Sequence, residues 1–113
     1  MIPDTLRHRL RSMKVYALLT GEYCGGGAVE TARALLRGGA DVIQMREKSL
    51  EDGELLQRAD ALRRLTEQFG ALFIVNDRPD VAVLCGADGV HLGDRDLPPE
   101  RVRKLVGPRM AIG

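Results

Sequence analysis

Residues 71–92, ALFIVNDRPDVAVLCGADGVHL, hold in one stretch the pattern that decides the fold. The opening ALFIV is a short apolar run of strand-forming residues, and it stops at three polar residues, 76–78. Pro79 then suits the first turn of a short helix, and GVHL at the end of the stretch is predicted to be a second strand. Strand, helix and strand joined by loops of a few residues predict parallel neighbouring strands with a helix packed outside them.

The same alternation continues in both directions along the chain. The predicted strands are residues 14–19, 41–45, 71–75 and 89–92, with the start of a fifth at 109–113, and the predicted helices are residues 28–39, 49–70, 79–86 and 98–107. In the longest helix Ser49 is the predicted cap and Gly70 the predicted end. Its apolar face is formed by Leu55, Ala59, Leu62 and Leu65.

Two architectures produce this pattern, the open doubly wound sheet and the (β/α)8 barrel. The first would favour a GxGxxG turn directly after the first strand. The glycines of GEYCGGG, Gly21 and residues 25–27, have a different spacing and predict a flexible loop. In both architectures ligands bind at the carboxyl ends of the strands.

The composition is that of an ordinary globular domain. Of the 113 residues 44% are hydrophobic and 29% are charged, and the net charge of +1 gives no overall attraction to nucleic acid or to anionic membranes. No apolar run is long enough to span a bilayer, and two cysteines without CxxC spacing suit a reducing compartment, so a cytoplasmic protein is expected. A solvated basic helix face is predicted near the N-terminus from Arg7, His8, Arg9, Arg11 and Lys14.

Polar residues follow three successive predicted strands. They are QMREK at residues 44–48, NDR at 76–78 and HLGDRD at 91–96. Because the carboxyl ends of parallel strands meet at one edge, these three clusters are expected to converge on one rim.

Alternation along the strands predicts which side chains point inward. Ile43 and Met45 would face the helices, and the inward set would be Val42, Gln44, Arg46, Leu72, Ile74 and Asn76. Buried amides and an arginine destabilise a fold unless a partner satisfies them, and a bound anion would do so. Arg46 offers a planar fork of donors to phosphate oxygens, and Lys48 adds a mobile positive charge.

Asp77 and Asp96 come from successive rim loops and predict a magnesium ion shared with a diphosphate. Each has an alternative role: Asp96 could cap the next helix, and Asp77 could be a turn residue. Arg46 and Glu47 could form a surface ion pair, and His91 could be a satisfied inner-face histidine.

The motifs QMREK, VNDRPDVAVLCGADGVHLGDRDLP and the closing AIG closely resemble the thiamine-phosphate synthase family, over about residues 15–113. The resemblance implies a (β/α)8 TIM barrel whose first four β/α units and the start of strand five form a domain of residues 1–113. It implies an enzyme that joins an aminopyrimidine methyl diphosphate to a thiazole phosphate and releases diphosphate. The missing later loops would hold most of the thiazole phosphate, so this chain is expected to be an N-terminal half, inactive alone.

By the same resemblance, the aminopyrimidine diphosphate is bound by Gln44, Met45, Arg46, Glu47, Lys48 and Asn76. Asp77 and Asp96 match the Mg²⁺ ligands. Arg46 and Lys48 are the catalytic residues implied, since they stabilise the charge that develops on the departing diphosphate.

Two other functions remain open. One is a TenI-like thiazole tautomerase on the same fold, although such proteins tend to lack the REK and ND motifs present here. The other is a non-catalytic half-barrel that binds diphosphate or assembles with a partner. An incomplete barrel leaves two sheet edges open, and the inward faces of VYALL and ALFIV are predicted to be bare, so self-association is expected.

Overall fold

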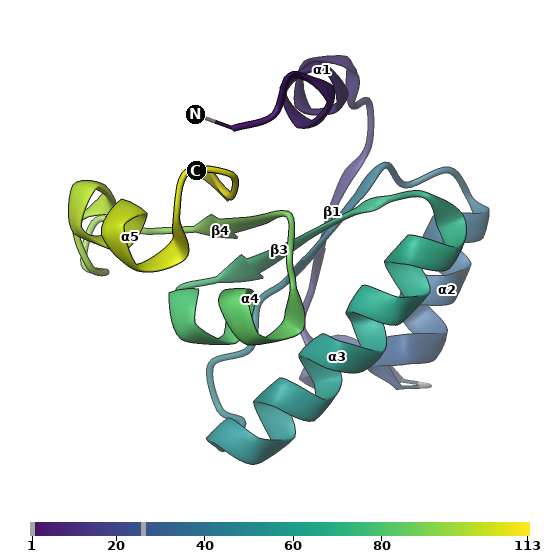
Figure 1. Cartoon of the computed structure of the whole chain (residues 1–113). Helices are drawn as coiled ribbons and strands as arrows, with labels where there is room; N and C mark the ends of the chain where they lie inside the picture. Colours follow the sequence, from purple (N-terminus) through teal and green to yellow (C-terminus); the bar gives the residue numbers. More distant parts are fainter. Residues whose placement is uncertain (1, 26) are drawn as a thin grey trace.

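The computed structural model describes residues 2–25 and 27–113. In this part of the chain helices and strands alternate as predicted, with ends shifted by a few residues (Figure 1). The elements are α1 (Asp4–Ser12), β1 (Tyr16–Leu19), the 3-10 turn η1 (Gly21–Tyr23), α2 (Ala28–Arg37), β2 (Val42–Met45), α3 (Asp52–Phe69), β3 (Leu72–Asn76), α4 (Pro79–Cys85), β4 (Gly89–His91), α5 (Pro99–Val106) and β5 (Ala111–Ile112). None of these helices has the length and apolarity that crossing a membrane requires.

The five strands form one parallel sheet in the order in which they occur in the chain, β1-β2-β3-β4-β5. Tyr16 pairs with Val42, and Val42 pairs with Leu72, so the first three strands start level with one another. A doubly wound sheet reverses its strand order near the middle, whereas a barrel adds each strand beside the previous one. The consecutive order therefore excludes the doubly wound alternative.

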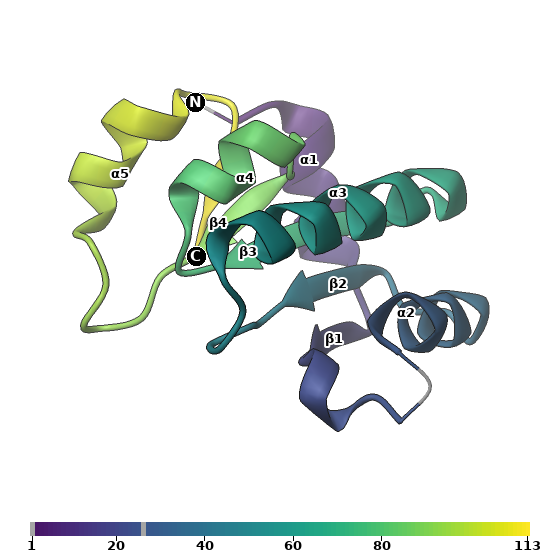
Figure 2. The same ribbon diagram turned by 90° about the horizontal axis from the view of Figure 1, so that it is seen from below.

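Helices α2, α3, α4 and α5 follow one another around the outside of the strands (Figure 2). The layer between them and the sheet is the main core, and Ile43, Phe73 and Val75 are fully buried there. The predicted apolar face of α3 is confirmed, because all four of its residues are buried: Leu55, Ala59, Leu62 and Leu65.

Of the two predicted ends of α3, the C-terminal one is confirmed and the N-terminal one is wrong. Gly70 terminates the helix in the left-handed conformation with φ 68°, as glycine readily does. The predicted Ser49 cap is wrong: Glu51 precedes the first turn, and its side chain makes no capping hydrogen bond. Ser49 lies in the loop from β2 to α3, too early to reach the first-turn amides.

Helix α1 lies on the opposite face of the sheet from α3 and α4 (Figure 1). Its Leu6 and Leu10 pack against a second buried cluster formed by Val42, Leu72 and Ile74. The prediction that the inward face of ALFIV is bare is therefore wrong, because α1 covers it. The other half of that prediction, a bare inward face on β1, remains.

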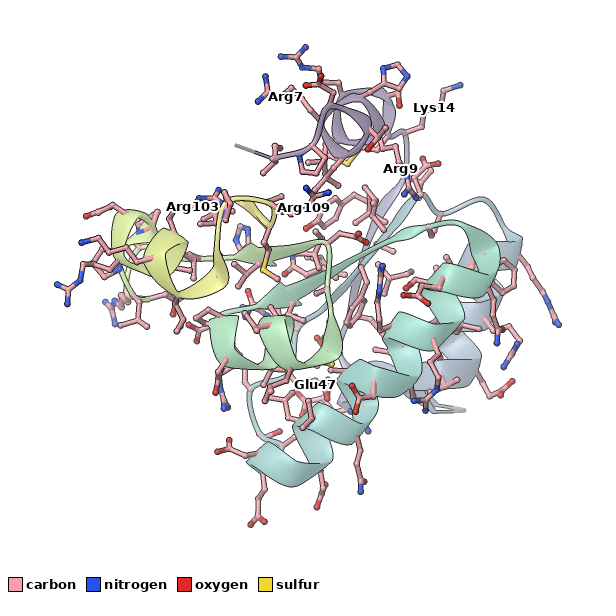
Figure 3. All side chains as sticks on the ribbon, viewed as in Figure 1. Arg7, Arg9, Lys14, Glu47, Arg103 and Arg109 are labelled. Atoms are coloured by element: carbon pink, nitrogen blue, oxygen red, sulfur yellow. The ribbon has the colours of Figure 1, made fainter. Side chains whose placement is uncertain are left out.

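The basic residues of α1 lie at the surface, where Figure 3 shows Arg7 and Arg9 on the helix and Lys14 just after its end. Arg9 also ties α1 to the rest of the molecule, since its Nη2 donates a hydrogen bond of 2.5 Å to the carbonyl oxygen of Gly70.

We expect residues 1–113 alone to self-associate. Among the described strands, β1 and β5 each pair with a single neighbour, and Leu18 on β1 is 61% exposed. Open strand edges beside apolar side chains template pairing with another chain. Analytical ultracentrifugation should show a concentration-dependent sedimentation coefficient, and Leu18→Lys should reduce it. A compact monomer at all concentrations would contradict this expectation.

Candidate functional site

An open cleft of about 650 Å³ occupies the inner face of the sheet and includes Arg46, Asn76 and His91 at the carboxyl ends of the strands. Its polar lining comes from successive strands: Tyr16, Gln44, Arg46, Asn76 and His91. The predicted inward set is confirmed by position, since its polar members line this cleft and its apolar members lie in the cleft or under α1.

Asn76 is the unsatisfied group in the cleft. It is 7% exposed, and its Nδ2 has no hydrogen-bond partner among the described residues. Buried polar groups are nearly always paired, and an unpaired one destabilises the fold. The other buried amide, Gln44, is satisfied because its Nε2 donates to the Tyr16 hydroxyl at 2.6 Å. The cleft therefore presents an amide donor that lacks an acceptor.

Tyr16 is a member of this lining that sequence reasoning missed. Burial raises the pKa of its phenol, so the hydroxyl stays protonated at neutral pH and can donate as well as accept. The feature of the sequence that could have identified Tyr16 is its position along the strand. Tyr16 alternates with Leu18 on one face of a strand, just as Gln44 alternates with Val42 on the next.

Arg46 is anchored through its backbone and free at its side chain. Its N–H donates to the Leu19 carbonyl at 2.9 Å, and its own carbonyl accepts the Thr20 hydroxyl at 2.8 Å. The guanidinium makes no hydrogen bond to the described residues and lines the cleft. Lys48 lies at the same rim, with its Nζ 3.9 Å from Asp77 Oδ2.

Asp77 and Asp96 are brought together although they come from different loops. The neighbouring Asp96 carboxyl group raises the pKa of Asp77, and the same contact lowers the pKa of Asp96, as when two carboxylates share one proton. Asp96 does not cap α5, whose N-cap is Pro98; its Oδ2 accepts the Gly93 N–H at 2.6 Å instead. Asp77 has a left-handed backbone, with φ 63°, so it is a turn residue and a rim carboxylate at once.

Two carboxylates at hydrogen-bonding distance repel one another when both are ionised, and a cation between them removes that repulsion. The donor set of Asp77 and Asp96 thus fits a divalent ion with oxygen ligands. Within residues 2–25 and 27–113 no group of three or more His, Cys, Asp or Glu side chains is arranged to hold a metal.

Two residues of the QMREK segment turn away from the cleft. Met45 is fully buried in the core under the helices. The Glu47 side chain is 5% exposed, and its carboxylate forms an ion pair with Arg58 of α3, not with Arg46. Figure 3 shows Glu47 beside α3, away from the basic residues of α1.

Of the remaining polar residues identified from the sequence, some line the cleft and others do not. His91 is exposed and lines the cleft, so it is not a satisfied interior histidine. The Arg78 guanidinium points elsewhere and binds Asp80 and Asp52. Of the predicted flexible loop at residues 25–27, Gly26 lies outside the described residues.

Comparison with known proteins identifies relatives of the chain. The family model described as thiamine monophosphate synthase matches residues 15–113. The thiamine-phosphate synthase of Methanoculleus marisnigri is 52% identical over 98 residues, which cover 85% of this chain and 46% of the relative. That of Albidiferax ferrireducens is 41% identical over 114 residues, covering 97% of this chain and 52% of the relative.

A solved structure of the thiamine phosphate pyrophosphorylase from Pyrococcus furiosus superimposes with a TM-score of 0.84 at 40% identity, covering 96% of this chain and 50% of that one. The chain thus spans about half the length of the relatives it matches. This likeness confirms the predicted fold, a TIM barrel represented by roughly its N-terminal half.

The carboxyl pair makes a prediction for titration. In an NMR titration of the side-chain carboxyl carbons, Asp77 should titrate above the ordinary pKa of an aspartate, because Asp96 disfavours its ionisation. Asp96→Asn should lower the pKa of Asp77, since the like charge is removed. Asp94→Asn, an exposed change in the same loop, should leave it unchanged. An Asp77 titration that is the same in Asp96→Asn would show that the two groups do not interact.

Proposed function

The chain belongs to the thiamine monophosphate synthase family, and from this premise we propose that its cleft binds the diphosphate of an aminopyrimidine methyl diphosphate. The full reaction proposed is transfer of the aminopyrimidinylmethyl group to the nitrogen of a thiazole phosphate, with release of diphosphate. The cytoplasmic location expected from the sequence stays a prediction.

The observation that carries the proposal is the unpartnered Asn76 amide in a cleft whose rim holds the free guanidinium of Arg46. A ligand with several anionic oxygens satisfies both donors at once, because phosphate oxygens accept hydrogen bonds from amides and bind arginine in a fork. Lys48 adds a second positive charge. A neutral ligand would leave these charges without compensation.

The chemistry proposed asks little proton transfer of the protein. The bond between the methylene carbon and the diphosphate oxygen breaks, the oxygen keeps the electron pair, and the pyrimidine stabilises the resulting cation. The thiazole nitrogen then donates its lone pair to that carbon. Arg46 and Lys48 stabilise the negative charge that grows on the leaving group, which is electrostatic catalysis. Asp77 and Asp96 would hold Mg²⁺, which supplies further charge neutralisation for the diphosphate.

The role of Gln44 and Tyr16 in this proposal is to orient the ring. Their mutual hydrogen bond of 2.6 Å fixes both groups on the inner wall of the cleft. The Tyr16 hydroxyl proton and the second amide hydrogen of Gln44 remain to direct a heterocycle that accepts hydrogen bonds.

We expect Arg46→Ala to weaken binding of Mg²⁺–diphosphate by about 1.5–3 kcal/mol, the size of a hydrogen bond to a charged group. Added salt should weaken binding by the unchanged protein as well. Isothermal titration calorimetry with inorganic diphosphate measures both effects. The matched control is Arg64→Ala, which removes the same charge from an exposed position on α3. Equal affinities of Arg46→Ala and unchanged protein would remove Arg46 from the site.

We also expect residues 1–113 to bind diphosphate without producing thiamine phosphate. Holding two substrates in attack geometry supplies several kcal/mol of catalysis, and in the family the thiazole phosphate depends on later loops. An assay with both substrates tests this, and substantial turnover would contradict it. Isomerisation of a thiazole carboxylate phosphate would favour the tautomerase alternative instead. Binding that persists without either reaction when a C-terminal half is added would favour the non-catalytic one.

A further inference from the structure

We propose that Glu47 is a positioning residue that locks the anion-binding loop to its two neighbours, and not a ligand of the substrate. The lock consists of Gly21, Glu47 and Arg58, called here the rim clamp. Its consequence for anion affinity rests on the proposed function; its effect on the loops does not.

The Glu47 carboxylate has both oxygens engaged inside the protein. Oε1 accepts the Gly21 N–H at 2.5 Å, and Oε2 pairs with the Arg58 guanidinium. At 5% exposure the Glu47 side chain has little surface left for a ligand. It also carries the same sign of charge as a diphosphate, so moving it into the cleft would oppose binding.

The rim clamp joins three elements that are distant in sequence. Gly21 begins the turn η1 after β1, Glu47 lies in the loop after β2, and Arg58 lies on α3. Two further bonds already hold the same loops together: Arg46 N–H to the Leu19 carbonyl, and the Thr20 hydroxyl to the Arg46 carbonyl.

In the sequence Glu47 lies between the two basic residues of the rim, Arg46 and Lys48. Fixing its carboxylate on the helix side therefore restricts the backbone from which Arg46 and Lys48 project to the rim. A forked donor gains affinity when it is held in place before the ligand arrives, because less conformational freedom is lost on binding.

The lack of space for a side chain at Gly21 allows a test of the rim clamp. A Cβ added there would overlap the Arg58 guanidinium and lie 3.2 Å from Glu47 Oε2. The backbone of Gly21 does not have a positive φ, so alanine itself introduces no backbone strain. Gly21→Ala should therefore displace Arg58 from Glu47 without removing either charge, and it should have no such effect once Arg58 is truncated.

The experiment combines amide hydrogen exchange with calorimetry on Glu47→Ala, Arg58→Ala, Arg58→Lys, Gly21→Ala and the double variant Gly21→Ala/Arg58→Ala. Exchange is followed at Gly21 and Arg46, whose N–H groups are hydrogen-bonded, with Val75 of the buried strand β3 as the reporter of global unfolding. Calorimetry measures binding of inorganic diphosphate with Mg²⁺. Arg64→Ala on the same helix is the charge-matched control.

We expect Glu47→Ala and Arg58→Ala each to speed exchange at Gly21 about tenfold relative to Val75 and to weaken diphosphate binding about tenfold, the scale of losing one hydrogen bond to a charged group. Arg58→Lys should restore part of both effects of Arg58→Ala. Gly21→Ala should speed exchange at Arg46 in the unchanged background and add nothing in Arg58→Ala. Arg64→Ala should change neither readout.

Unchanged exchange at Gly21 and Arg46 in Glu47→Ala would overturn the proposal, whatever the affinity. In particular, lost affinity with intact protection would identify Glu47 as a direct ligand. If unchanged protein binds no diphosphate, the proposed function fails, while the exchange results still decide whether the rim clamp exists.

Discussion

The parallel alignment of five consecutive strands is the constraint on which the rest of the molecule depends. Because every strand runs the same way, every strand ends at the same edge, and the polar residues that end or follow β2, β3 and β4 are placed along that edge. Alternation then divides each strand between two tasks. Ile43 and Phe73 pack under the outer helices, while Gln44 and Asn76 reach the cleft. A shift of one residue in register would exchange these two sets.

Much of this follows from local periodicity, which is why it could be predicted. The face of α3 follows from spacing along one helix, and the inward set follows from alternation along one strand. The residues that escaped prediction depend on where separate elements meet. Nothing near Glu47 in the sequence indicates that it contacts Arg58. That arginine lies beyond the next loop, about two turns into α3. Leu6 and Leu10 mark an apolar helix face but do not say which face of the sheet it covers. Ser49 has the chemistry of a cap and lies too early in the loop to act as one.

The rim contains the groups that a fold selected for stability alone would not keep. Asn76 has a buried donor without an acceptor, and Asp77 has a second carboxylate within reach and a left-handed backbone. Gln44 shows that the same environment can satisfy an amide when a partner is supplied. Unsatisfied and repelling groups at one edge, beside a neighbour that is fully satisfied, are typical of sites that exchange protein contacts for ligand contacts.

The position of α1 affects how this half of a barrel can be made. Helix α1 precedes the sheet in the sequence, yet the carbonyl that Arg9 binds belongs to a residue 61 positions later. Its leucines have no partner until β2 and β3 lie side by side. During translation the helix is therefore made before the strands on which it packs. The order of folding is then the reverse of the order of synthesis at this end: the sheet first and the N-terminal helix after it. A long loop must close before that contact stabilises anything, which makes docking of α1 a late and slow event.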